Sequence, residues 1–210
     1  LQGFSRLEMG LTIGAPRHYV PALAYPAIVL GGMGLIAWAA GAIDTSNTDW
    51  DKALTNIVLM SSTGVIMTLI TEEGFFRGWL WAALKRAGKS DLAVLTWTSL
   101  AFTAWHMPAI SLDTGFNVPP GEIPIYLVNA TLLGFAWGLL RMVSGSVLVP
   151  AVCHAVWNGI NYPMYGFGEK VGALGIQATH IFGPEVGVIG VGLNALVVAA
   201  LFYRLSWNRK

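Results

Sequence analysis

The chain carries the stretch ALTNIVLMSSTGVIMTLITEEGFFRGWLWAA at residues 53–83, which is long and apolar enough to cross a bilayer as a helix. Within it lie two adjacent carboxylates, Glu72 and Glu73, and a guanidinium, Arg77. Ionisable side chains are costly inside a membrane and usually face the interior of a helix bundle or a wet cavity. The stretch therefore predicts both a membrane-spanning helix and a functional site on it.

Composition extends this prediction to the whole chain. Of the 210 residues, 55% are hydrophobic and only 11% are charged, and the mean hydropathy is +0.61, values outside the range of ordinary soluble domains. We predict an all-α, polytopic membrane helix bundle of about six transmembrane helices, in a single integral membrane domain over residues 1–210 with a motif-bearing core at about 53–165. The other apolar runs lie at about 20–43, 92–110, 123–143, 146–164 and 186–204.

Charged residues outside the spans predict the orientation of the chain. The basic ones gather at alternate ends of the spans, at Arg6, Arg17, Lys85, Arg86, Lys89, Arg141, Arg204, Arg209 and Lys210. By the positive-inside rule, both termini should be cytoplasmic. The net charge of +1 and the lack of a broad basic surface argue against a nucleic-acid partner, and the cluster at 85–89 suits lipid headgroups better. The first residue is Leu1 rather than methionine, which is compatible with further sequence upstream.

The ionisable residues of the 53–83 stretch do not all have the same explanation. Glu73 and Arg77 are four positions apart, so they share a helix face and can form an ion pair. Such a pair would lock helices together without any further function. Glu72 is rotated by about 100° from Glu73 and is left without that partner. We therefore interpret Glu72 as a functional residue.

Two further segments each place a histidine in an apolar run. His106 follows Phe102 by four positions, and His154 precedes Asn158 by four, so each pair shares a helix face. A histidine with one satisfied hydrogen bond is an ordinary core residue, and polar contacts between helices would account for Asn158 alone. Two imidazoles among so few intramembrane polar groups instead indicate a common site.

Depth in the membrane supports a common site. At ~1.5 Å rise per residue, Glu72 lies ~20 Å from the basic end of its segment, and His106 lies ~22 Å from the start of its own. On the same scale Asn158 lies ~20 Å and His154 ~13 Å beyond the start of theirs. With an alternating topology, the four side chains reach one broad layer of the membrane.

These side chains fit two mechanisms of peptide hydrolysis. In the first, a carboxylate deprotonates a water molecule while imidazole or amide donors stabilise the tetrahedral oxyanion. In the second, Glu72, His106 and His154 are the ligands of a catalytic Zn²⁺ that leaves one position open for the attacking water. The signature His-Glu-x-x-His is absent, so any metal site has to be assembled from three helices. Both mechanisms stay open on the sequence alone.

Three motifs together resemble the signature of a known family. They are Glu-Glu-x-x-x-Arg at 72–77, Phe-x-x-x-His at 102–106 and His-x-x-x-Asn at 154–158, on separate predicted helices. In this order they resemble the motifs of the CAAX protease and bacteriocin-processing (CPBP) family of intramembrane proteases, also called the ABI family, which is related to the Ras-converting enzyme. The resemblance implies an intramembrane endopeptidase of glutamate or metallo type. Its implied substrates are membrane-associated proteins or peptides, such as CaaX-like or leader peptides.

The resemblance also implies roles for individual residues. Glu72 is the implied general base with His106 as its partner, and His154 with Asn158 is the implied oxyanion-stabilising pair. Zn²⁺ is an implied cofactor, although a metal-free glutamate mechanism is also proposed for the family. The compact chain resembles prokaryotic members, so we expect a prokaryotic cytoplasmic membrane. The full set of implied catalytic residues is Glu72, His106, His154, Asn158, Glu73 and Arg77.

Two functions of other classes remain as alternatives. One is a non-catalytic membrane-binding or bacteriocin self-immunity protein that keeps the polar core without cleaving anything. The other is a proton or cation transporter, since buried carboxylates and histidines also form relays. A transporter needs a polar path to both surfaces, and the outer halves of the predicted spans carry few polar residues.

Overall fold

Each apolar run contains a helix in the computed structural model, which describes residues 3–112, 117–168 and 170–207. The long helices are α1 (Tyr19–Ala39), α2 (Trp50–Thr68), α4 (Asp91–Trp105), α6 (Ile123–Ser144), α7 (Leu148–Tyr165) and α9 (Val188–Trp207), and α2 continues through η2 (Leu69–Leu80) into α3 (Trp81–Arg86). The short elements are η1 (Pro16–His18), α5 (Met107–Ser111), η3 (Pro120–Glu122), β1 (Gly166–Phe167), β2 (Lys170–Val171) and α8 (Thr179–Phe182). The predicted all-α membrane bundle is confirmed.

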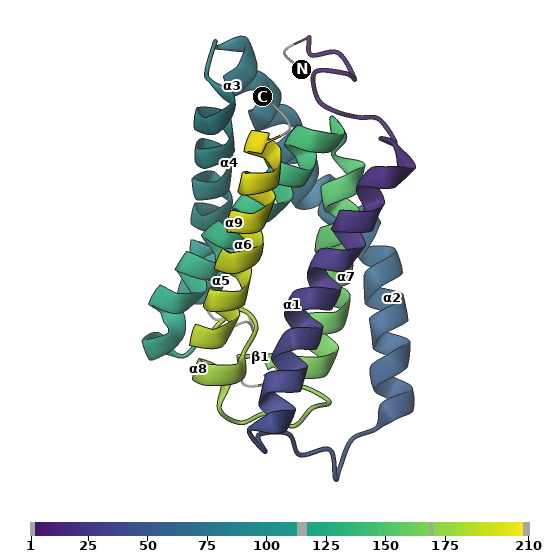
Figure 1. Ribbon diagram of the computed structural model, residues 1–210, viewed down its shortest axis with the longest axis vertical. Coiled ribbons are helices and arrows are strands. Elements are labelled where there is room, and N and C mark those ends of the chain that lie inside the picture. Colours follow the sequence, from purple (N-terminus) through teal and green to yellow (C-terminus); the bar gives the residue numbers. More distant parts are fainter. Residues whose placement is uncertain (1–2, 113–116, 169, 208–210) are drawn as a thin grey trace.

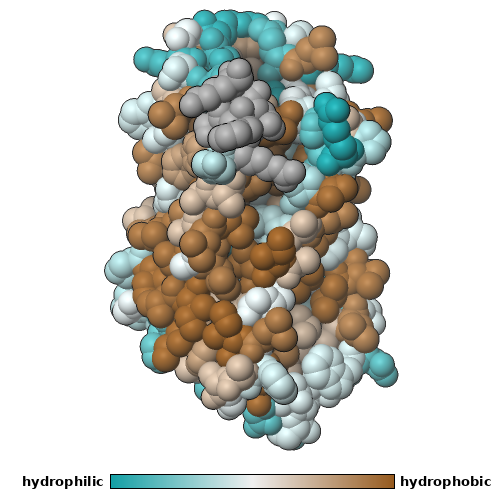
Figure 2. Space-filling model, in the orientation of Figure 1, coloured by the Kyte–Doolittle hydropathy of each residue, from teal (hydrophilic) through white to brown (hydrophobic). Residues whose placement is uncertain are grey.

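The surface of the bundle suits a bilayer. Within the part of the chain that the structure describes, three helical stretches are long and apolar enough to cross a membrane by length and composition, namely Pro16–Ala39, Trp50–Arg86 and Pro120–Ser144. Figure 2 shows a broad hydrophobic band around the middle of one face, with hydrophilic residues toward both ends. Large apolar side chains such as Leu35 and Ile66 are more than half exposed on the surface of the bundle. The chain is an integral membrane protein, and the number of six spans stays a prediction.

Helix α7 lies inside the bundle, where it contacts α1, α2 and α6 (Figure 1). Helix α4 packs on α6, and α9 packs on α6 and α1. The N-terminal segment and the end of α9 lie at the same end of the bundle in Figure 1, as expected for termini on one side of a membrane. Which side is cytoplasmic stays a prediction, and two of its basic residues, Arg209 and Lys210, lie outside the described residues.

Glycines allow α7 and α2 to approach closely. A β-carbon added at Gly159 would lie 2.7 Å from the backbone nitrogen of Ser61, and one at Gly64 would lie 3.2 Å from the Cβ of Ala155. Small residues let membrane helices pack backbone to backbone, where van der Waals contact replaces the hydrophobic driving force. The α2–α7 contact places α2, which continues into the segment that bears Glu72, against the helix that bears His154.

We expect Gly159→Val to destabilise the bundle by separating α2 from α7, at a cost of about 1–3 kcal/mol for overpacking. The midpoint of thermal unfolding in detergent should fall measurably. The matched control is Gly31→Val on α1, because no atom lies within 4 Å of a β-carbon there. Equal midpoints for the two variants would show that the close approach is not needed.

Candidate active site

The segment that carries the three ionisable residues of the first motif is a π-helix, η2, rather than the continuous α-helix that the sequence predicts. π-Helical turns are rare and occur frequently at functional sites. A β-carbon at Gly74 would clash with the carbonyl oxygen of Leu69, so the glycine permits this wide turn. On the neighbouring helix α6, Arg141 donates from Nε to the carbonyl oxygen of Arg77 at 2.9 Å and holds the segment in place.

We expect Gly74→Ala to lower activity more than stability, because the backbone of η2 has to shift to admit the methyl group. Cleavage rate and unfolding midpoint should be measured on the same preparation. Gly32→Ala is the control, since its nearest neighbour would be a Leu193 methyl at an ordinary 3.9 Å. Unchanged cleavage by the Gly74 variant would mean that the π-turn has no part in placing the site.

Glu73 is at the centre of a buried polar network. Its Oε1 lies 3.2 Å from Arg77 Nη1 and 3.0 Å from His154 Nδ1, and both Glu73 and Arg77 are fully buried. Arg77 also donates from Nη2 to the carbonyl oxygen of Gly134 at 3.0 Å, and its guanidinium lies 4.6 Å from the ring centre of Phe102. Paired charges with further hydrogen bonds are the form in which ions are tolerated in an apolar interior. The pair with Arg77 matches the predicted four-residue spacing, whereas the contact with His154 was not predicted.

His154 is held rigidly by its surroundings. Its ring stacks on Trp137 with centroids 3.7 Å apart and an interplanar angle of 14°. An ionised Glu73 only accepts hydrogen bonds, so Nδ1 of His154 carries a proton and Nε2 remains for other partners. In the neutral ring Nε2 is an acceptor, and it becomes a donor only when the ring carries a second proton.

His106 lies at a break in its helix. The sequence predicts one helix over 92–110, but α4 ends at Trp105 and α5 starts at Met107. Pro108 lies in the first turn of α5, where it lacks an N–H for the preceding turn and prevents the helix from continuing unbroken. His106 Nδ1 lies 2.8 Å from the carbonyl oxygen of Phe102, so Nδ1 carries the proton and Nε2 keeps its lone pair when the ring is neutral.

His106 Nε2 faces Glu72. Its distance to Glu72 Oε2 is 3.9 Å, which is too long for a direct hydrogen bond. Glu72 Oε2 is buried and has no hydrogen-bond partner among the described residues. A polar gap of this length between two acceptors suits one bridging water molecule. The two side chains are 21% and 19% exposed, although the Oε2 atom of Glu72 is itself buried.

A small cavity joins the second and third motifs. Its volume is about 20 Å³, room for about one water molecule, and we call it the inner cavity. Glu72 does not border it but faces His106, which does. Asn158 borders it without a hydrogen bond to any described residue. The lining residues are Phe102, His106, Tyr126, Ala130, Leu133, Trp137, His154, Asn158, Tyr162 and Glu185.

Glu185 is a member of the inner cavity that the sequence did not reveal. It lies between α8 and α9, where its charge suggests only a polar loop, yet it is 6% exposed and accepts a hydrogen bond from Trp157 Nε1 at 2.7 Å. Burial raises the pKa of Glu185 to about 7, against the opposing effect of its hydrogen bonds from Trp157 and Asn161. The one available signal was its position directly before the last apolar run.

The predicted zinc ligands do not form a metal site in this arrangement. Among the residues that the structure describes, no three His, Cys, Asp or Glu side chains converge closely enough to hold a metal ion. His154 donates Nδ1 to Glu73, so only its Nε2 is left as a ligand atom, and as placed it does not converge with Glu72 and His106 closely enough to complete a site. The donor set as placed therefore does not fit Zn²⁺, and zinc binding stays a prediction.

A comparison with protein families identifies the core of the chain. The model of the family described as type II CAAX prenyl endopeptidase Rce1-like matches residues 54–160, just over half of the 210 residues. This range contains all three motifs, from η2 to α7. No match was found among curated proteins or among solved structures. The chain belongs to the Rce1-like family of type II CAAX prenyl endopeptidases, a family of membrane proteases.

Proposed function

We propose that the protein hydrolyses peptide bonds of membrane-associated substrates with a water molecule activated by Glu72. The observation that carries the proposal is the 3.9 Å gap between the unpartnered Glu72 Oε2 and His106 Nε2. A water molecule in this gap donates one hydrogen bond to each acceptor, which leaves an oxygen lone pair free for attack.

The remaining residues fit the later steps. Glu72 accepts a proton from the water as its oxygen bonds to the substrate carbonyl carbon. Asn158 Nδ2 and protonated His154 Nε2 then donate to the oxyanion, while Glu73 and Arg77 hold His154 in position. When the C–N bond breaks, Glu72 returns its proton to the leaving nitrogen, and the products are a carboxylic acid and an amine.

The family name gives the class of substrate to test first. We propose peptides that end in a prenylated Cys-aliphatic-aliphatic-X sequence, with leader peptides as the second class, at a prokaryotic cytoplasmic membrane. The protein in liposomes should cleave a farnesylated, fluorescence-quenched peptide of this sequence. Mass spectrometry in ¹⁸O-water should find one heavy oxygen in the new carboxylate. If intact peptide is all that is recovered for both classes, the non-catalytic membrane-binding alternative gains support.

The glutamate mechanism predicts that cleavage does not depend on a metal ion. We expect the rate to be unchanged within error after dialysis against a strong chelator, because all proton transfers and the oxyanion contacts come from side chains. Metal content should be measured on the same sample by mass spectrometry. A chelated enzyme that loses activity and recovers it with zinc would establish the metallo mechanism instead.

A further inference from the structure

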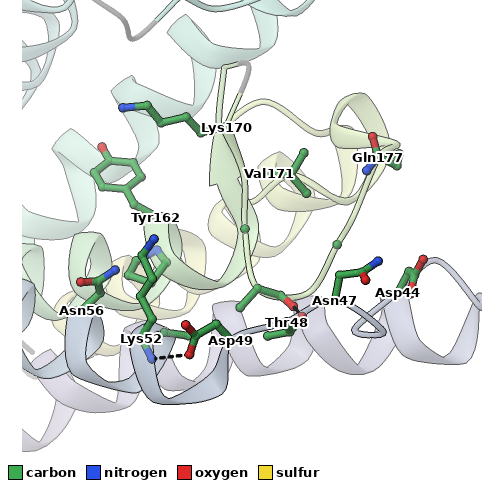
Figure 3. A pocket seen from close by; sticks show the side chains of 15 residues that line it. Asp44, Asn47, Thr48, Asp49, Lys52, Asn56, Tyr162, Lys170, Val171 and Gln177 are labelled. Carbon is green, nitrogen blue, oxygen red and sulfur yellow. Dashed lines mark hydrogen bonds between the residues drawn. The ribbon is translucent and has the colours of Figure 1, made fainter.

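A second, much larger cavity opens at the end of the bundle that lies opposite the termini. Its volume is about 640 Å³, and we call it the outer pocket. This volume is typical of ligand sites, whereas the inner cavity has room for about one water molecule. A peptidase needs space for several residues of its substrate. Of these two cavities, only the outer pocket has that much room. Figure 3 shows residues that line it, which come from the α1–α2 connection, α2, α7 and the strand β2 with the residues after it.

Tyr162 connects the outer pocket to the inner cavity, because its side chain lines both. Its ring lies 5.8 Å from that of Phe167, which lies 5.7 Å from Tyr126, whose ring is 6.2 Å from His106. Aromatic side chains thus form part of the partition between the two spaces. A third cavity, of about 370 Å³ beside Lys85, shares no residue with the inner cavity.

The lining of the outer pocket suits a peptide with a free carboxylate. Lys52 extends from α2 toward Tyr162 in Figure 3 and forms no ion pair with a described residue. The nearby carboxylates already accept backbone hydrogen bonds at 3.0 Å, Asp49 from Lys52 N–H and Asp44 from Ser46 N–H. Asp49 also caps the N-terminus of α2, where the helix dipole offsets its charge. None of the ion pairs among the described residues includes Lys52, so its ammonium is open to an anionic group.

We propose that the outer pocket binds the C-terminal segment of the peptide substrate, with the terminal carboxylate on Lys52 and the scissile bond entering the inner cavity past Tyr162. This inference rests on the proposed function, since it assigns the substrate segment that lies beyond the cut. Amide groups of Asn47, Asn56 and Gln177 supply hydrogen bonds to the polar main chain of that segment.

The test compares a free acid with its amide. In liposomes, Lys52→Gln should raise KM about tenfold for the farnesylated peptide with a free C-terminal carboxylate, because one charge-assisted hydrogen bond is lost. KM for the same peptide with a C-terminal amide should not change, and kcat should stay the same for both. Lys85→Gln, in the third cavity, is the matched control and should leave both values unchanged. Equal effects of Lys52→Gln on acid and amide overturn the proposal.

Cross-linking locates the peptide independently of kinetics. In a Cys153→Ala background, Asn56→Cys should form a bond with an uncleavable peptide that carries a thiol-reactive group on its last residue, whereas Lys85→Cys should not. The opposite pattern places the substrate at the other end of the bundle and refutes the assignment. A wild-type protein that cleaves neither the acid, nor the amide, nor a leader peptide refutes the proposed function, whereas cleavage without these differences refutes only the role of the outer pocket.

Discussion

Glu72→Gln should reduce the rate of peptide cleavage by about 100- to 10,000-fold, the range expected for loss of a general base. The amide has almost the same shape as the carboxylate but cannot accept a proton from water. The fold should be retained, because Glu72 has no direct hydrogen bond from His106 and no hydrogen-bond partner at Oε2. The measurement is the initial rate on the quenched peptide in liposomes, together with the unfolding midpoint.

Glu122→Gln is a closely matched control for this experiment. Glu122 is also a buried carboxyl group, and its Oε1 accepts a hydrogen bond from Thr179 Oγ1 at 2.9 Å, but it does not border the inner cavity. We expect the Glu122→Gln variant to cleave the quenched peptide at a rate close to that of the wild type. Cleavage by Glu72→Gln at the same rate as this control would exclude Glu72 as the base. Retention of a cellular phenotype by Glu72→Gln without cleavage would favour a binding role.

Arg77→Met should have the largest effect on stability, a loss of about 3–5 kcal/mol, because it leaves the fully buried Glu73 without its cation. It also removes the hydrogen bond to the Gly134 carbonyl that ties η2 to α6. The measurement is the free energy of unfolding in mixed detergent, or the yield of folded protein if the variant does not assemble.

A double variant separates the charge effect from lost packing. When Glu73→Gln is added to Arg77→Met, no unpaired ion remains, so the double variant should be less destabilised than the sum of the two single variants. Additive effects would show that the ion pair contributes little and that the guanidinium acts mainly by its packing against Phe102.

The helices and the polar residues of the site were predictable because both depend on local sequence. Apolar runs of membrane length give the helices, and four-residue spacing gives the Glu73–Arg77 pair. The helix break at His106 also has a local cause, because Pro108 disfavours a continuous helix. The residue at which the helix ends was not predictable from Pro108 alone. These features need no knowledge of which helices are neighbours.

The features that the sequence did not predict are those that depend on contacts with residues far along the chain. The π-helix forms where η2 contacts Arg141 on α6, and the sequence of η2 alone does not indicate that contact. Arg141 itself looked like a basic residue at the membrane surface, yet it is 6% exposed. Glu185 enters the inner cavity only because the α8–α9 connection folds back on Trp157. Tertiary contacts of this kind override what local composition suggests.

The size of the inner cavity has a kinetic consequence. A space of about 20 Å³ does not admit a peptide bond with its flanking side chains, so under the proposed function we expect the inner cavity to open before each turnover. We expect opening, and not bond cleavage, to limit kcat, so that substrates with different leaving groups turn over at nearly the same rate. A cavity that has to open for its substrate would also spare the many membrane proteins that diffuse past it, since only a segment that displaces the lining side chains could be cleaved there.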